Sequence, residues 1–213
     1  MRLWTASNKE WRKNEQIRRR RHYLYNGGVF KNKLSIQDSE LLKTAEKEFS
    51  AVRAQYLLLQ PITDNFDLAH LQTIHRELFG DVYDWAGEIR RIDISKGNTR
   101  FANFAFIENE SRKLLEKLRN ENYLQGLDKD KFAERVAYYL GELNVLHPFR
   151  EGNGRTLRLF MTQLAMKNGL QIHWQNISAE QMIQACIQAY HADSSLLARL
   201  ILENLEQSSF SDD

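Results

Sequence analysis

Apolar residues recur three and four positions apart through most of this chain, which is the spacing of an amphipathic helix. The clearest run joins Leu68, Leu71, Ile74 and Leu78, and Asp67 stands before it as a helix cap. The same spacing, bounded by capping residues, glycines and prolines, predicts further helices. These run from Asp38 or Ser39 to about Leu59, about Phe106 to Tyr123, Phe132 to Leu146, Thr156 to Lys167, and Ser178 to about Glu206.

The segment from Glu88 to Phe104 has a different period. Two sets of side chains alternate there, and the dipeptide Gly97-Asn98 follows as a turn signal. One set contains Ile89, Arg91, Asp93 and Ser95, and the other contains Arg90, Ile92 and Ile94. This alternation predicts a short β-hairpin. Because the chain shows no internal repeat, we expect a mainly α fold, a helical bundle with one small β-hairpin.

Charge is distributed unevenly along the chain. The 213 residues hold 30 Lys and Arg against 28 Asp and Glu, so the formal net charge of +2 does not itself imply a polyanionic partner. Residues 1–31 are strongly basic and include the run Arg18 to Arg21. We expect residues 1–34 to be a basic extension packed on a domain of residues 35–206, with a loose tail at 207–213. No base-reading motif accompanies the basic run, so a solvated terminus is favoured over nucleic-acid binding.

Composition excludes several kinds of site. The single cysteine, Cys186, excludes an intrachain disulfide and a metal site built from cysteines. No stretch approaches the roughly 18 to 20 apolar residues of a membrane-spanning helix, and the start lacks the apolar core of a secretory signal. We therefore expect a protein made in the cytoplasm, without a membrane span.

The segment His147–Arg158 interrupts the helical pattern. Pro148 should end the preceding helix and bias His147 toward an extended backbone. The segment is then a loop that enters the next helix at its N-terminus, where backbone N–H groups and the helix dipole favour an anion. Gly152 and Gly154 let the backbone approach that anion closely.

Side chains of the same segment complete a polyphosphate site. Asn153 adds an amide donor, and the planar guanidinium groups of Arg155 and Arg158 suit phosphate oxygens. Glu151 fits beside an anion if it binds a cation, because Mg²⁺ is usually held by a carboxylate together with phosphate oxygens. His147 is the group nearby that can accept a proton near neutral pH. The residues predict a magnesium-polyphosphate site with its own base.

Other phosphate and metal motifs are absent from the sequence. There is no Gly-Lys-Ser/Thr of a P-loop and no Gly-x-Gly-x-x-Gly. His70 and His75 are poorly spaced to share a metal ion, so we expect core or surface histidines there.

At every specified position the segment resembles the signature of the Fic family, His-x-Phe-x-Asp/Glu-Gly-Asn-Gly-Arg-x-x-Arg. The resemblance covers about residues 35 to 205. The start, from Tyr23 to Leu34, looks like the Fic modules of bacterial type IV secretion effectors and related toxins. The family resemblance implies a protein adenylyltransferase that moves AMP from ATP to a Tyr, Thr or Ser hydroxyl of a target protein. In such an enzyme His147 would be the general base.

The resemblance also assigns the remaining site residues. Glu151 would hold Mg²⁺, while Arg155 and Arg158 would bind the β- and γ-phosphates. The hairpin resembles the Fic flap, which lines the nucleotide site and registers the target segment by strand addition. The α- and β-phosphates would lie against Gly152, Asn153 and Gly154, and the flap candidates are Lys96, Gly97, Asn98 and Thr99.

Many Fic proteins carry an inhibitory helix with the motif Ser/Thr-x-x-x-Glu-Gly/Asn. Thr44 to Glu48 has that spacing, but Phe49 follows it, and Thr73 to Glu77 is followed by Leu78. Neither matches. We therefore expect no inhibition in cis, and a small antitoxin-like protein that pairs its glutamate with Arg158.

Two alternatives stay open on the sequence. A Fic fold can carry another reaction, such as UMP transfer, phosphocholine transfer or AMP removal. A module that binds a nucleotide without catalysis is the second alternative. The resemblance to effectors also leaves open delivery into a host cell by a type IV system.

Overall fold

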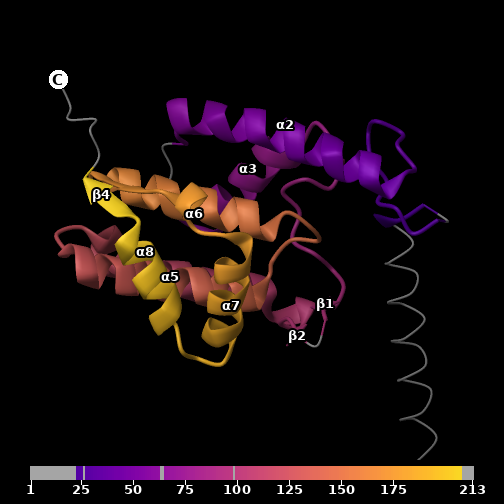
Figure 1. Cartoon of the computed structure of the whole chain (residues 1–213). Helices are drawn as coiled ribbons and strands as arrows, with labels where there is room; N and C mark the ends of the chain where they lie inside the picture. The colour runs from indigo at the N-terminus through magenta and orange to yellow at the C-terminus, as the bar shows by residue number, and fades with distance from the viewer. Residues whose placement is uncertain (1–22, 26, 63–64, 98, 208–213) are drawn as a thin grey trace, which may run out of the picture.

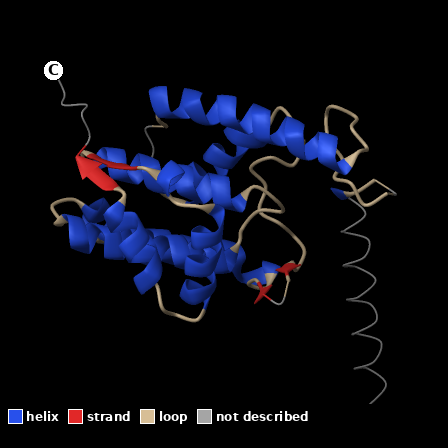
Figure 2. Cartoon of the chain, in the orientation of Figure 1, coloured by secondary structure: helices blue, strands red, loops and turns tan. Residues whose placement is uncertain are grey.

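The computed structural model describes residues 23–25, 27–62, 65–97 and 99–207. Helices make up most of this part of the chain, and the strands form two short pairs at its edges (Figure 2). The helices are α2 (Ser39–Leu59), α3 (Leu68–Phe79), α4 (Ile107–Asn120), α5 (Lys129–Leu146), α6 (Asn153–Lys167), α7 (Ala179–Tyr190) and α8 (Ser195–Glu203). The predicted mainly α architecture with a small hairpin is confirmed.

The helices pack side by side across the molecule, in an order that differs from their order along the chain (Figure 1). α2 lies on α3, α3 on α6, and α6 on α5, while the far side of α5 is covered by α7 and α8. The side chains between these layers are fully buried apolar groups, among them Ile74, Phe132, Val136 and Phe160. Removal of their surface from water, at about 25 cal/mol per Å², stabilises the bundle and holds the α5–α6 connection in place.

Side chains cap several helices at the predicted positions. Asp38, Asp67 and Ser178 each accept hydrogen bonds from backbone N–H groups of the helix that follows. α5 begins earlier than predicted, at Lys129, because Asp128 accepts the N–H of Lys131 at 2.8 Å and caps it.

The single long C-terminal helix predicted from Ser178 to Glu206 is wrong. α7 ends at Tyr190 and α8 begins at Ser195, with Ala192 between them at φ 65°. Asp193 Oδ1 accepts the N–H of Ser195 at 3.0 Å. Short polar side chains that bond to nearby backbone in this way compete with helix continuation.

A second sheet was not predicted. β3 (Leu170–Ile172) pairs antiparallel with β4 (Leu205–Gln207), with Leu170 opposite Gln207. Gln207, expected in a loose tail, is therefore the last residue of a strand. Residues 208–213 lie outside the described residues.

The hairpin is shorter than predicted. Its strands are β1 (Ser95–Lys96) and β2 (Thr99–Arg100). The segment before β1 is no strand, because the N–H of Arg90 donates to the carbonyl of Pro148 at 2.9 Å instead of to a strand partner. Asn98 lies outside the described residues.

The described part of residues 1–34 packs on the domain. Tyr23 and Phe30 meet the ring of Trp85 edge-on, each with centroids 5.9 Å apart. The N–H of Lys33 donates to the carbonyl of Val82 at 2.8 Å. The basic run Arg18 to Arg21 falls outside the described residues.

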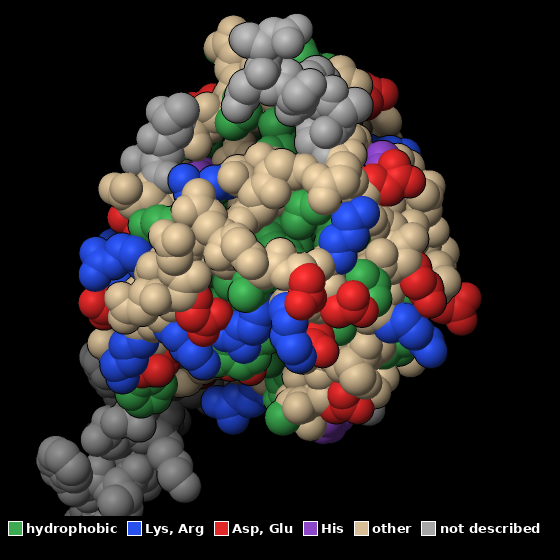
Figure 3. Space-filling model, turned by 90° about the vertical axis from the view of Figure 1, so that its left-hand side faces the viewer, with side chains coloured by type: hydrophobic (Ala, Val, Ile, Leu, Met, Phe, Trp, Pro, Cys, Tyr) green, Lys and Arg blue, Asp and Glu red, His purple; other side chains and the backbone are tan. Residues whose placement is uncertain are grey.

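The surface carries both signs of charge. On the face shown in Figure 3, Lys and Arg side chains are interspersed with Asp and Glu. Several exposed pairs form within one helical turn, for example Lys113 with Glu110 and Lys131 with Glu134. Across the described residues no helix has the length and apolar character needed to span a membrane.

Candidate active site

His147 stands at the junction between α5 and α6. Pro148 ends α5 at Leu146, as predicted, but His147 adopts the left-handed region (φ 47°, ψ 63°) instead of the expected extended backbone. Proline disfavours the right-handed helical region for the residue before it, and the left-handed region also avoids that clash. The N–H of His147 still donates to the carbonyl of Leu143 at 2.9 Å, so the turn caps α5.

The imidazole of His147 is oriented as a base. Its Nδ1 lies 3.2 Å from the carbonyl oxygen of Asn144, an acceptor, so Nδ1 carries the proton and Nε2 keeps its lone pair. Phe101 stacks on one face of the ring, with centroids 3.7 Å apart and planes 15° apart. Burial lowers the pKa of His147 to about 4, and the charges of Arg90 and Lys96 act in the same direction. The ring is neutral at pH 7 and can accept a proton.

The first turn of α6 offers backbone donors. Gly152 precedes it at φ 77°, and a Cβ at this position would lie 2.4 Å from the ring of Phe79. Only glycine fits there. The N–H groups of the first turn have no partner within a helix, so residues Asn153, Gly154 and Arg155 present theirs at its positive end.

The Asn153 side chain does not serve as the expected donor to an anion. It is buried, and its amide both donates to the carbonyl of Phe149 and accepts the N–H of Phe149, each at 2.9 Å. The side chain therefore closes the loop, and only the backbone N–H of Asn153 faces an anion. Phe149 is fully buried, and its ring stacks on that of His75 with centroids 4.0 Å apart.

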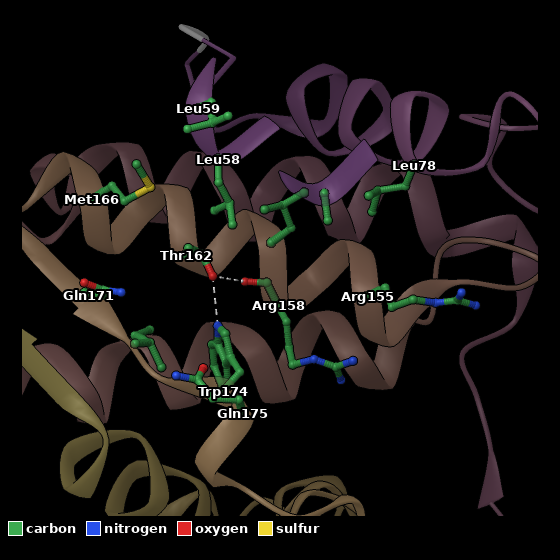
Figure 4. Close-up of a pocket in the computed structure, with 13 residues that line it drawn as sticks. Leu58, Leu59, Leu78, Arg155, Arg158, Thr162, Met166, Gln171, Trp174 and Gln175 are labelled. Carbon is green, nitrogen blue, oxygen red and sulfur yellow. Dashed lines mark hydrogen bonds between the residues drawn. The ribbon is translucent and has the colours of Figure 1, made fainter. Parts of the chain in front are cut away.

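Arg155 and Arg158 lie on one side of α6 (Figure 4). Arg155 pairs with the carboxylate of Glu46 on α2 and donates to Ser50 Oγ at 2.9 Å. The guanidinium of Arg158 has no hydrogen bond or ion pair with any residue that the structure describes, and burial lowers its pKa. Both side chains line a cavity of about 440 Å³ whose other walls are mainly apolar, including Leu58, Leu78, Met166 and Trp174.

Glu151 is exposed beside the helix N-terminus. Its Oε1 accepts the N–H of Gly152 at 3.0 Å, and its backbone carbonyl lies 3.0 Å from His75 Nε2. An exposed carboxylate next to backbone donors for an anion fits a cation shared with that anion.

The model of the Fic/DOC family matches residues 65–165. A relative from Escherichia coli, named "Probable protein adenylyltransferase Fic", is 46% identical over 164 residues, which are 76% of this chain and 81% of that protein. The chain belongs to the Fic/DOC family.

Other Fic relatives extend the comparison. "Protein adenylyltransferase VbhT" of Bartonella schoenbuchensis is 44% identical over 84% of this chain, but the match spans only 38% of that longer protein. Two solved structures of Bartonella effectors are close in fold. BepC of Bartonella tribocorum, with bound AMPPNP, is 30% identical with a TM-score of 0.82, covering 89% of this chain and 98% of that one. The N-terminal Fic domain of a Bartonella quintana effector, with bound ADP, is 32% identical with a TM-score of 0.84, covering 88% and 96%.

The hairpin lies next to the Fic motif. Its last strand leads into Phe101, whose ring covers His147, and the charge of Lys96 reaches the same imidazole. Gly97 forms the turn at φ 56°, and Thr99 begins β2. The structure therefore places the end of the hairpin, and the charge of the flap candidate Lys96, next to the base.

His70 and His75 are core histidines, as predicted. His70 Nε2 lies 2.8 Å from Gln163 Oε1. His75 Nδ1 accepts the N–H of Gly87 at 2.7 Å, so its Nε2 carries the proton and donates to the carbonyl of Glu151. Burial lowers the pKa of His75 to about 4, which keeps this ring neutral while it supports the motif loop.

The sequence analysis missed Arg90, Phe101 and Glu46 as parts of this site. A signal for Arg90 was present, because in the alternating segment it shares a face with Ile92 and Ile94. A charged residue on an apolar face is unusual and points to a buried role. No comparable local signal marks Phe101 or Glu46.

Proposed function

We propose that this chain is a protein adenylyltransferase that transfers AMP from ATP to a side-chain hydroxyl of another protein. The observation that carries the proposal is a neutral, partly buried imidazole with Nε2 unprotonated, beside the first turn of α6 and its arginines. Relatives named as protein adenylyltransferases, 42% to 46% identical over most of this chain, support the same activity.

In the proposed reaction, Nε2 of His147 takes the proton of a Tyr, Thr or Ser hydroxyl. The hydroxyl oxygen forms a bond to the α-phosphorus of ATP as the bond to the bridging α–β oxygen breaks, and pyrophosphate leaves. The α- and β-phosphates lie against Gly152, Asn153 and Gly154, and the backbone N–H groups of Asn153 and Gly154 donate to them. Arg155 and Arg158 neutralise the β- and γ-phosphates. Positioning and charge neutralisation supply most of the rate in such phosphoryl chemistry.

Glu151 is the residue proposed to hold Mg²⁺. Its carboxylate is exposed at the edge of the helix N-terminus, and one oxygen is already oriented by the N–H of Gly152. The metal would supply further neutralisation of the polyphosphate.

The hairpin is proposed as the flap that holds the target. Two short strands with exposed residues at Ser95, Lys96 and Arg100 leave backbone groups on which an extended segment can add as a third strand. Lys96, Gly97, Asn98 and Thr99 are the proposed contact residues.

A separate inhibitor is proposed to act through Arg158. The guanidinium of this residue has no hydrogen bond or ion pair within the described residues and lies at the wall of a largely apolar cavity, so it suits a glutamate on an amphipathic helix of an antitoxin-like protein. We expect the isolated chain to be constitutively active. Strong activation by Glu48→Gly or Glu77→Gly would instead reveal inhibition in cis.

Delivery into a host cell by a type IV system is part of the proposal. Its support is the likeness to the Fic domains of VirB-translocated Bartonella effectors. A translocation reporter fused to the chain, in bacteria with and without a functional secretion system, tests it.

The function is tested by incubating the chain with α-labelled ATP, Mg²⁺ and a bacterial or host lysate. We expect label on protein with the natural chain and a loss of at least 100-fold with His147→Ala. The matched control is His173→Ala, in a turn that contacts Glu206. Equal labelling by His147→Ala would remove His147 as the base. Binding of ATP without any labelled protein would leave a nucleotide-binding module.

A further inference from the structure

One buried arginine of the Fic domain, Arg90, forms no ion pair with a carboxylate of the described residues, although the charge of Asp93 acts on it. Arg90 is 1% exposed, and its direct partners are backbone carbonyls. Nε donates to His147 at 2.7 Å and Nη1 donates to Ile92 at 2.6 Å, while Nη2 donates to Ala102 at 2.6 Å and to Leu146 at 3.1 Å. Burial of a guanidinium is costly, so a group that only filled space would be apolar.

The partners of Arg90 belong to two parts of the site, the end of α5 that carries His147 and the base of the hairpin. These two parts must keep a fixed position relative to each other. Leu146 and His147 are at the C-terminal end of α5, where carbonyls lack helical partners and favour a positive charge. The backbone N–H of Arg90 also donates to the carbonyl of Pro148 at 2.9 Å. These bonds fix the peptide units on both sides of the Pro148 ring and hold His147 in a left-handed conformation that few residues adopt.

The same guanidinium fixes the base of the hairpin. Ala102 accepts from Arg90 through its carbonyl, and its N–H donates to the carbonyl of Val145 at 3.1 Å. Phe101, the residue before it, is the ring that stacks on His147. Loss of the guanidinium would therefore release the imidazole and the ring that covers it together.

The backbone segment that carries Arg90 is itself held against α3. Gly87, three residues earlier, donates its N–H to His75 and accepts from Gln72 Nε2 at 2.9 Å. At φ 85° a Cβ on Gly87 would lie 3.0 Å from atoms of α3, so the segment rests directly on that helix. The guanidinium thus extends from a fixed point.

We propose that Arg90 is the positioning residue of this site, which holds the base His147 and the flap in the one arrangement that lines up hydroxyl, imidazole and α-phosphate. The proposal rests on the proposed function. It assigns Arg90 no contact with ATP, whose phosphates are placed against Gly152 to Arg158.

The test compares Arg90→Lys and Arg90→Gln with Arg91→Lys, an exposed arginine on the same segment, as the matched control. Lysine keeps the charge but replaces the planar fork with a single point of donation. We expect Arg90→Lys to lower kcat by about 10- to 100-fold, because a small misplacement of a base has this effect. The KM for ATP should change by less than about threefold, and Arg91→Lys should match the natural chain.

A second readout does not require catalysis. In ¹⁵N spectra of the imidazole, the natural chain should show His147 protonated at Nδ1, and both Arg90 variants should show mixed tautomers. Unchanged kcat per folded molecule with an unchanged tautomer would overturn the proposal, as would the failure of both variants to fold. If the natural chain labels no protein, the proposed function fails, while the spectra still decide the role of Arg90.

Discussion

His147 is kept neutral chiefly by burial, and the positive charges of Arg90 and Lys96 act in the same direction. Its pKa is lowered from 6.5 to about 4, so the deprotonated form that acts as base persists as the pH falls. We expect kcat/KM to stay flat from about pH 8 down to about pH 6 and to decline only as the pH approaches 4. The measurement is the pH profile of labelling at low substrate concentration.

A fall in kcat/KM with a midpoint near pH 6.5 would mean that His147 has the pKa of an ordinary histidine. It would contradict the argument that burial lowers this pKa. The prediction concerns kcat/KM, because this quantity reports the pKa of His147 in the free enzyme. In the complex, the negative charge of the bound polyphosphate would favour the charged imidazole and raise its pKa. The profile of kcat should therefore break at a higher pH than that of kcat/KM.

Single residues show what the sequence could and could not reveal. The identities in the motif predicted a loop at a helix N-terminus, and Gly152 lies as expected. The backbone of His147 and the inward turn of the Asn153 amide were not predicted. Both depend on hydrogen bonds within the folded loop, such as that from Asn153 to Phe149, which spacing along the chain does not specify.

At the scale of the element, the entry into α6 depends on two glycines with different tasks. Gly152→Ala would place a Cβ 2.4 Å from the buried ring of Phe79 at φ 77°. We expect a loss of about 3 kcal/mol in the free energy of unfolding, from overpacking and left-handed strain together. Urea denaturation measures it.

Gly154→Ala is the matched control for that substitution. Its Cβ would lie 3.3 Å from Nη1 of Arg158, the end of a flexible side chain, and its backbone is helical. Alanine is favoured over glycine in a helix, so we expect a change within about 1 kcal/mol. Similar losses in both variants would mean that the Phe79 contact is not what requires Gly152.

Elements set by local signals were predicted better than those set by distant partners. The caps Asp38, Asp67 and Ser178 gave correct helix starts. The pairing of β3 with β4 joins residues far apart in sequence, and nothing local at Leu205 distinguishes a strand from the end of a helix. The same limit applies to the segment before β1, whose hydrogen bonds go to the motif loop.

At the scale of the whole molecule, β4 fastens the end of the described chain to α6 through β3. Leu205 is 5% exposed and belongs to the main core, whereas Glu206 is exposed. We expect Leu205→Ala to lower the free energy of unfolding by about 3 kcal/mol, from lost burial and the cavity it leaves. The control, Glu206→Ala, removes only a contact with His173, and its cost should stay below about 1 kcal/mol.

The bundle as a whole followed from helical spacing and from one motif, because both reflect local chemistry. The packing of its layers against one another could not be predicted from either. Glu46 on α2 and Arg155 on α6 stand far apart in the sequence, and their pairing depends on how α2, α3 and α6 stack.

The hydroxyl of Tyr190, at the end of α7, donates to the carbonyl of Arg100 at 2.9 Å. In this hairpin Ser95 and Arg100 are a non-hydrogen-bonded pair. Their backbone N–H and C=O groups therefore point away from each other, toward the two opposite edges of the hairpin. The phenol of Tyr190 therefore already occupies one edge of the hairpin, and an added strand would have to pair with the edge that carries Ser95. For the proposed strand addition, a tyrosine on a distant helix thus limits the side from which a third strand can join.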